Sequence, residues 1–88
     1  MQYTIVMYRE PDGSYSVSVP ALKGCHTCGD TIAQAIQMAE EAISLFVESL
    51  QARGLPVPKD AKQVTVQTKD SPEVMLYRLQ LQGEHALA

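Results

Sequence analysis

The sequence has 88 residues, of which 45% are hydrophobic, and its formal net charge is −3. This length corresponds to one small domain whose core is marginal by itself, so association with another chain would add stability. The negative charge argues against nucleic acid as the main partner and favours a basic protein.

No apolar run approaches the ~20 residues that span a bilayer, and the first residues, MQYTIVMYRE, lack the basic and apolar regions of a signal peptide. Two cysteines are too few for a secreted disulfide scaffold. We therefore expect a cytoplasmic protein that does not bind membranes.

The first 19 residues predict a β-hairpin. Residues 3–8 are β-branched and aromatic at both alternating sets of positions, which is typical of a strand covered on both faces. The turn EPDG follows, in which Pro11 fixes φ and Gly13 accepts a positive φ. Residues 14–19 then alternate between polar and apolar side chains, as in a half-buried strand. The alternation places three serines on one face: Ser14, Ser16 and Ser18.

Residues 20–31, PALKGCHTCGDT, predict a bend, a short third strand and the start of a helix. Pro20 ends the second strand, because it cannot donate a hydrogen bond to a sheet ladder. Gly24 and Gly29 leave the ends of a strand at residues 25–28 free to bend.

A long amphipathic helix is the clearest element of the sequence. Apolar residues recur at spacings of three and four over about 20 positions. They are Ile32, Ala35, Ile36, Ala39, Ile43, Phe46, Val47 and Leu50. We expect Asp30 as the N-cap, followed by Thr31, and Gly54 at the C′ position. Glu40, Glu41 and Glu48 lie off the apolar stripe and should face water.

The C-terminal part contains one predicted strand and one ambiguous segment. Residues 62–68 alternate and predict a fourth strand, which closes a domain over residues 1–69. Within residues 70–88, the DSPE sequence is typical of a helix start, whereas the apolar alternation that follows is typical of a strand. We favour the helix. The segment is apolar enough that it should pack on the domain or on another subunit.

Together these elements predict an α+β domain of order β-β-β-α-β. One long helix packs on an antiparallel-rich sheet, and the short C-terminal segment completes the chain.

The CxxC sequence at Cys25 and Cys28 raises the alternative of a redox or zinc-binding protein. A redox pair needs its first thiol at a helix N-terminus, but both cysteines precede the expected N-cap. A zinc site needs about four converging ligands, and neighbours such as His26 point to the other face of a strand. We prefer the interpretation that these cysteines are small packed side chains.

No other pattern indicates catalysis or a cofactor. Glu40 and Glu41 are adjacent and should diverge by about 100° around the helix, so they do not form an acid–base pair. The strand serines lack a nucleophile elbow, and no glycine-rich phosphate loop is present. We predict a protein that is not an enzyme, without catalytic residues, bound metal or cofactor.

The motifs PDGSYSV, PALKGCHTCGDT and RGLPVP, in their order over about residues 1–68, resemble the HicB-like antitoxin family. The resemblance implies a partial RNase H fold. It also implies structural roles for the motif positions Pro20, Gly24, Cys25, Gly29, Asp30, Thr31 and Gly54.

The resemblance further implies a function. Proteins of this family neutralise a small mRNA-cleaving toxin by covering its RNA-binding and active surface, and many carry a C-terminal DNA-binding domain. Only about 20 residues follow the fourth predicted strand, too few for two DNA-binding helices. We therefore expect no direct DNA binding.

The sequence thus predicts a protein-binding module, the antitoxin of a type II toxin-antitoxin pair, whose partner is a HicA-like mRNA interferase. We also expect a homo-oligomer, a dimer or a tetramer. Candidate partner-binding residues are Glu40, Glu41, Glu48, Ser14, Ser16 and Ser18. The alternatives are an orphan self-associating or small-ligand module and, less favoured, a CxxC redox or zinc-binding protein.

Overall fold

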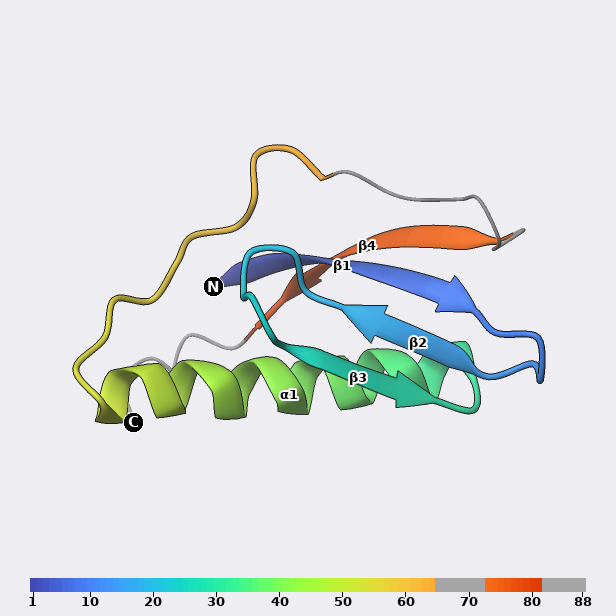
Figure 1. Cartoon of the computed structure of the whole chain (residues 1–88), viewed down its shortest axis with the longest axis horizontal. Helices are drawn as coiled ribbons and strands as arrows, with labels where there is room; N and C mark the ends of the chain where they lie inside the picture. The colour runs from blue at the N-terminus through green and yellow to red at the C-terminus, as the bar shows by residue number, and fades with distance from the viewer. Residues whose placement is uncertain (65–72, 82–88) are drawn as a thin grey trace.

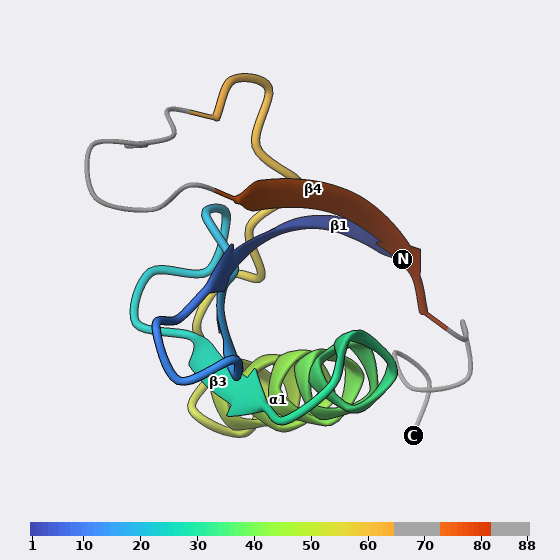
Figure 2. The same cartoon turned by 90° about the vertical axis from the view of Figure 1, so that its right-hand side faces the viewer.

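The structure is a computed structural model that describes residues 1–64 and 73–81. Within them one helix packs against one antiparallel sheet (Figure 1). The elements are β1 (Gln2–Arg9), β2 (Tyr15–Ser18), β3 (His26–Gly29), α1 (Ile32–Ala52) and β4 (Val74–Gln80). The strand order is β3-β2-β1-β4, and the sheet curls around α1 (Figure 2). The expected α+β class and the order β-β-β-α-β are confirmed.

The turn between β1 and β2 forms as its residues predict. Gly13 has φ +90°, and its N–H donates to the Glu10 carbonyl at 2.9 Å. The Asp12 carboxylate accepts hydrogen bonds from the Ser14 hydroxyl at 2.6 Å and the Ser14 N–H at 2.9 Å. These two bonds, the hydroxyl's first, hold the pKa of Asp12 below its usual value. The predicted hairpin is confirmed.

The PALKGC stretch makes a second reversal that contributes to the core. Gly24 has φ +92°, and the N–H of Val19 donates to the Cys25 carbonyl at 3.1 Å, which continues the pairing of β2 with β3. Leu22 is fully buried at the tip of this turn. The turn therefore buries an apolar anchor between two strands.

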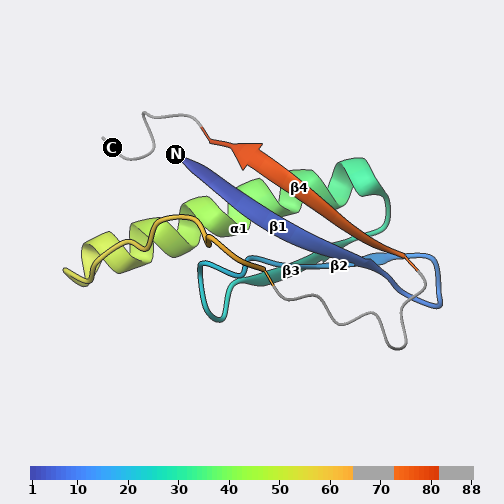
Figure 3. The same ribbon diagram turned by 90° about the horizontal axis from the view of Figure 1, so that it is seen from above.

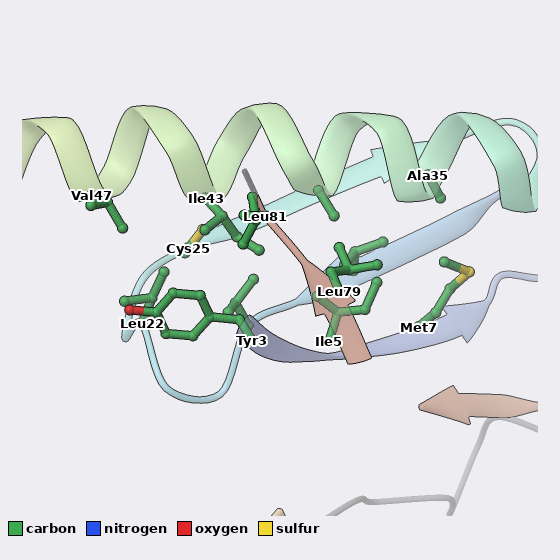
Figure 4. Close-up of a cluster of buried hydrophobic side chains, with 13 residues drawn as sticks. Tyr3, Ile5, Met7, Leu22, Cys25, Ala35, Ile43, Val47, Leu79 and Leu81 are labelled. Atoms are coloured by element: carbon green, nitrogen blue, oxygen red, sulfur yellow. The ribbon is translucent and has the colours of Figure 1, made fainter. Parts of the chain in front are cut away.

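The pairing register separates an inner sheet face from an outer one. Met7 pairs with Val17 of β2 and with Met75 of β4, and this row faces α1. The core between the sheet and the helix contains Tyr3, Ile5, Leu22, Ala39, Ile43, Val47 and Leu79 among others (Figure 4). Val6 lies on the outer face, yet it is also buried. The expectation that β1 is covered on both faces is confirmed for this residue.

The N-cap of α1 differs from the expectation. Thr31, not Asp30, is the N-cap: it is extended, and its hydroxyl accepts from the Gln34 N–H at 3.0 Å. The Asp30 N–H donates to the Gln34 side-chain oxygen at 2.6 Å. Gln34 therefore anchors the residue before the cap, in a variant of the capping box, and the Asp30 carboxylate is left exposed.

The C-terminus of α1 is a Schellman motif, as the predicted glycine indicated. Gly54 has φ +68°, and its N–H donates to the backbone carbonyl of Gln51 at 3.1 Å. The N–H of Leu55 donates to the backbone carbonyl of Leu50 at 2.9 Å. The chain then turns back over the side of the sheet opposite α1 (Figures 1 and 3).

The expected helix in residues 70–88 is wrong for the part that the structure describes. Residues 74–80 form β4, which pairs antiparallel with β1 along seven residues. Tertiary pairing with β1 overrides the local cap signal. Of the strand expected at 62–68, residues 62–64 are not in a strand, and the remainder lies outside the described residues. The expected domain boundary at 69/70 also lies outside them.

Residues 58–60 hold the returning chain onto β1, beyond the point where β2 ends. The Asp60 carboxylate accepts from the Thr4 N–H and from the Thr4 hydroxyl, both at 2.8 Å. The Tyr3 hydroxyl donates to the Pro58 carbonyl. Burial, and secondarily the Asp60 charge, raises the pKa of Tyr3 above 10.0. We call residues 58–60 the strap.

Gly29 should tolerate no side chain, because a Cβ there would lie 2.5 Å from the Ala35 backbone nitrogen. We expect Gly29→Ala to lower the free energy of unfolding by about 3 kcal/mol in urea titrations. Cys28→Ala, at the exposed neighbour, is the matched control and should change it by less than about 0.5 kcal/mol. Equal effects of the two substitutions would contradict the close approach.

Tyr3→Phe should remove the hydrogen bond to Pro58 and cost about 1 kcal/mol near neutral pH. Because the pKa of Tyr3 is raised in the folded state, the unfolded chain loses this proton first, from about pH 10 upward. The stability that Tyr3 contributes is thus present below pH 10 and is lost above it. Urea titrations across this range should show the difference between wild type and variant shrinking; a constant difference would contradict this.

Candidate partner-binding surface

The outer side of α1 is acidic and carries no basic residue. Glu40, Glu41 and Glu48 are exposed, as expected, and Ile32–Ala52 contains no Lys, Arg or His. Among the described residues, the ion pair present is Arg9–Glu73, at 3.0 Å on the sheet. The three carboxylates are therefore uncompensated by direct pairing, and they give this side of the domain a negative potential.

These glutamates border one hollow with two exposed apolar side chains. Met38 is 37% exposed and Leu45 is 66% exposed. The hollow measures about 690 Å³. It is lined by Thr27, Met38, Glu40, Glu41, Ala42, Ser44, Leu45, Glu48, Gln80 and Leu81. We call it the acidic hollow.

Helical spacing explains why apolar and acidic groups alternate here. Met38, Glu41, Leu45 and Glu48 follow one another at intervals of three, four and three residues, so they form one line along the outside of α1. Met38 and Leu45 are not among the partner-binding residues expected from the sequence. Their signal was present, because both are large apolar residues outside the core stripe and seven positions apart.

The arrangement suits binding of a macromolecule better than catalysis. Most side chains around the acidic hollow are exposed, so it is an open surface rather than an enclosed site that excludes water. Exposed apolar side chains beside charged ones are typical of protein interfaces, where apolar groups bury area and the charges steer association.

The three serines expected to bind a partner lie away from the acidic hollow. Register places Ser16 and Ser18 on the outer sheet face, opposite α1, and Ser14 in the hairpin turn. The Ser16 hydroxyl donates to the Glu10 carboxylate at 2.6 Å, and that of Ser14 donates to Asp12. The structure thus brings the three glutamates together but does not place the serines on the same surface.

The two cysteines are separated by the sheet. Cys25 is buried in the core beneath α1 (Figure 4), whereas Cys28 is exposed in the outer-face row that contains Ser16. Burial raises the pKa of the Cys25 thiol, which opposes formation of a reactive thiolate. His26, opposite Ser18, is also on the outer face. Among residues 1–64 and 73–81, no group of three potential metal ligands converges.

Comparison with known proteins identifies the family. The family model of the HicB-like antitoxins of bacterial toxin-antitoxin systems matches residues 3–77. The chain belongs to the HicB-like antitoxin family. The match spans all of β2, β3 and α1 and most of β1 and β4. The resemblance seen in the motifs is thereby confirmed, and the family is one of antitoxins rather than of enzymes.

Two curated proteins are similar to this chain over most of their length. A UPF0150 protein of Synechocystis sp. is 52% identical over 58 residues, which cover 66% of this chain and 73% of that protein. A UPF0150 protein of Thermoplasma acidophilum is 42% identical over 67 residues, covering 75% and 97% respectively.

Solved HicB structures share the fold. The N-terminal domain of the Burkholderia pseudomallei antitoxin HicB superposes with a TM-score of 0.67 at 25% identity, covering 93% of this chain and 99% of that domain. A chain of the HicA3–HicB3 toxin-antitoxin complex gives 0.68 at 25% identity, with the same coverage. A chain of a Streptococcus pneumoniae toxin-antitoxin complex gives 0.77 at 19% identity, covering 100% and 73%, which shows the fold alone.

The described part of this HicB-like chain contains no helix that is both long enough and apolar enough to cross a bilayer.

The two thiols should differ sharply in reactivity with a thiol-specific reagent. We expect Cys28 to be labelled in the native protein, and Cys25 to be labelled about 100-fold more slowly or only after unfolding, because it is buried. A Cys28→Ser variant isolates the slow thiol, and mass spectrometry after timed labelling measures both rates. Rapid labelling of Cys25, or zinc retained stoichiometrically, would instead support the redox or metal-binding alternative.

Proposed function

We propose that this protein is a non-enzymatic, cytoplasmic antitoxin that binds a small, basic, HicA-like mRNA-cleaving toxin and occludes its RNA-binding surface. The observation that carries the proposal is the acidic hollow, where three uncompensated carboxylates surround exposed Met38 and Leu45. Membership of the HicB-like family and the likeness to a chain of a HicA3–HicB3 complex support it. A likeness to a partial RNase H fold remains a prediction.

The proposed mechanism is competition for a basic surface. A protein that binds RNA neutralises phosphates with lysine and arginine side chains, and the same side chains are attracted by Glu40, Glu41 and Glu48. Leu45 and Met38 add apolar area that RNA phosphates do not offer. Occupation of that basic surface then excludes RNA without any chemical step by the antitoxin.

We place Ser14, Ser16 and Ser18 outside the main contact, because they lie away from the acidic hollow. A secondary contact with the same partner would require the toxin to reach around the sheet.

The proposal also includes self-association of the antitoxin into a homo-oligomer.

Neutralising the hollow should weaken toxin binding. We expect Glu41→Gln with Glu48→Gln to reduce affinity for a HicA-like toxin by about tenfold, mainly through slower association at low salt. Surface plasmon resonance at two salt concentrations measures both effects. Gln2→Lys with Gln63→Lys changes net charge equally at exposed positions off the hollow and is the matched control.

Growth assays complete the test. Co-expression of the wild-type antitoxin should rescue cells from the toxin, and the Glu41→Gln, Glu48→Gln pair should rescue them less well. Absence of a complex and of rescue with a toxin from the neighbouring reading frame would overturn the proposal in favour of an orphan module. Equal loss in the two variant pairs would leave toxin binding standing but remove the acidic hollow as its site.

A further inference from the structure

The free edge of β3 presents backbone groups that β2 does not use. The Val19 N–H donates to the Cys25 carbonyl at 3.1 Å, and the pairing of β2 with β3 continues from there in register. Backbone groups alternate in direction along a strand, so the odd-numbered residues of β3 face β2 and the even-numbered ones face outward. His26 and Cys28 therefore direct their N–H and C=O groups away from the sheet. Within the part of the chain that the structure describes, no hydrogen-bond partner meets them.

Helix α1 closes this edge at one end only. The N–H of Asp30 is the next that faces outward, and it donates to the Gln34 side-chain oxygen at 2.6 Å. Before that point both His26 and Cys28 are exposed, and every residue between the end of β2 and the start of α1 is described. Very short edge strands resist indiscriminate pairing. A strand that binds here therefore needs further contacts from the surfaces beside the edge.

The acidic hollow lies beside the same edge. The sheet curls from β4 round to β3, which lies next to α1 (Figure 2). Thr27 of β3 lines the hollow together with Met38, Glu41 and Leu45 of α1. Thr27 is opposite Val17, so its side chain is on the inner face of the sheet. A strand added to β3 would lie about 4.8 Å beyond it, and every second side chain of that strand would point to this inner face, toward the hollow.

The charges around this edge favour a basic segment over a second copy of this chain. On the hairpin turn, the turn before β3 and α1, the acidic residues are Glu10, Asp12, Asp30, Glu40, Glu41 and Glu48. Arg9 is paired with Glu73 at 3.0 Å and Arg53 lies at the far end of α1, which leaves Lys23 beside the edge. In a pair of identical copies the lysine of each would offset a single acid, and the other acids would repel each other. A basic segment is attracted by all of them.

We propose that a short basic segment of the toxin extends the sheet at β3, pairing with the backbone of His26 and Cys28 while its inward side chains enter the acidic hollow. Backbone hydrogen bonds fix the position of the segment, and the side chains at every second position supply specificity. Those side chains are basic or apolar, because they meet Glu41 and Met38. This inference rests on the binding of a basic toxin proposed above and names how that partner docks.

Amide hydrogen exchange followed by NMR tests the pairing at single residues. In the free protein the amides of His26 and Cys28 should exchange fast, and a HicA-like toxin from the neighbouring reading frame should slow each by at least about tenfold. The Thr27 amide faces β2 and is the internal control, slow in both states. A complex that leaves both outward amides fast would overturn this inference alone, and absence of a complex would overturn toxin binding as well. Slowing of these amides in the free protein at higher concentration would assign the edge to a second copy and overturn it too.

A proline substitution separates the backbone from the side chain. Cys28→Pro removes the outward N–H, whereas Cys28→Ala keeps it and is the matched control. An edge strand tolerates proline where the nitrogen faces outward, so the variant should fold. We expect Cys28→Pro to weaken toxin binding by at least about tenfold and Cys28→Ala by less than about twofold, measured by surface plasmon resonance. Equal affinities of the two variants would overturn the inference. Should Cys28→Pro fail to fold by circular dichroism, the exchange measurement decides.

Discussion

The close contact between Gly29 and the first turns of α1 determines how this small domain is built. No side chain fits between the end of β3 and the Ala35 backbone, so the helix lies directly on the strand. Small residues occupy the buried stripe at Ala35 and Ala39, and larger ones follow at Ile43 and Val47. One helix is therefore enough to cover the inner face, and no other helix or strand of residues 1–64 and 73–81 packs on its opposite side.

Because one helix covers the inner face of the sheet, the outer side of that helix is available for acidic residues. The buried stripe of α1 uses its apolar positions for the core, so its outer side is free to carry acids without a stability cost from burial. On the outer sheet face, Lys62 and Arg78 line a separate hollow beside Leu76. A basic partner would therefore be attracted to the helix side of the domain.

The sequence predicted those parts of the fold that local chemistry decides. The β1–β2 turn, the helix stripe and the Gly54 terminus each depend on residues within a few positions of one another. The N-cap was missed by one residue because Asp30 and Thr31 are both good caps, and the choice depends on Gln34. β4 was missed because its caps favour a helix, whereas its partner strand β1 lies 66 to 78 residues away in the sequence, from Tyr8↔Val74 to Gln2↔Gln80. The candidate glutamates followed from helical periodicity, but Met38 and Leu45 were overlooked because apolar residues were assigned to the core.

The position of β4 determines which of its backbone groups are paired. Pairing with β1 on one side buries Leu79 and Leu81, which satisfies the inner face of the strand. The same pairing exhausts only half of its backbone hydrogen-bonding groups, since alternate residues point outward. A helix in this segment would have satisfied its own backbone and left no edge. As a strand, the segment keeps its alternate backbone groups directed away from β1, and within residues 1–64 and 73–81 no further strand pairs with that side.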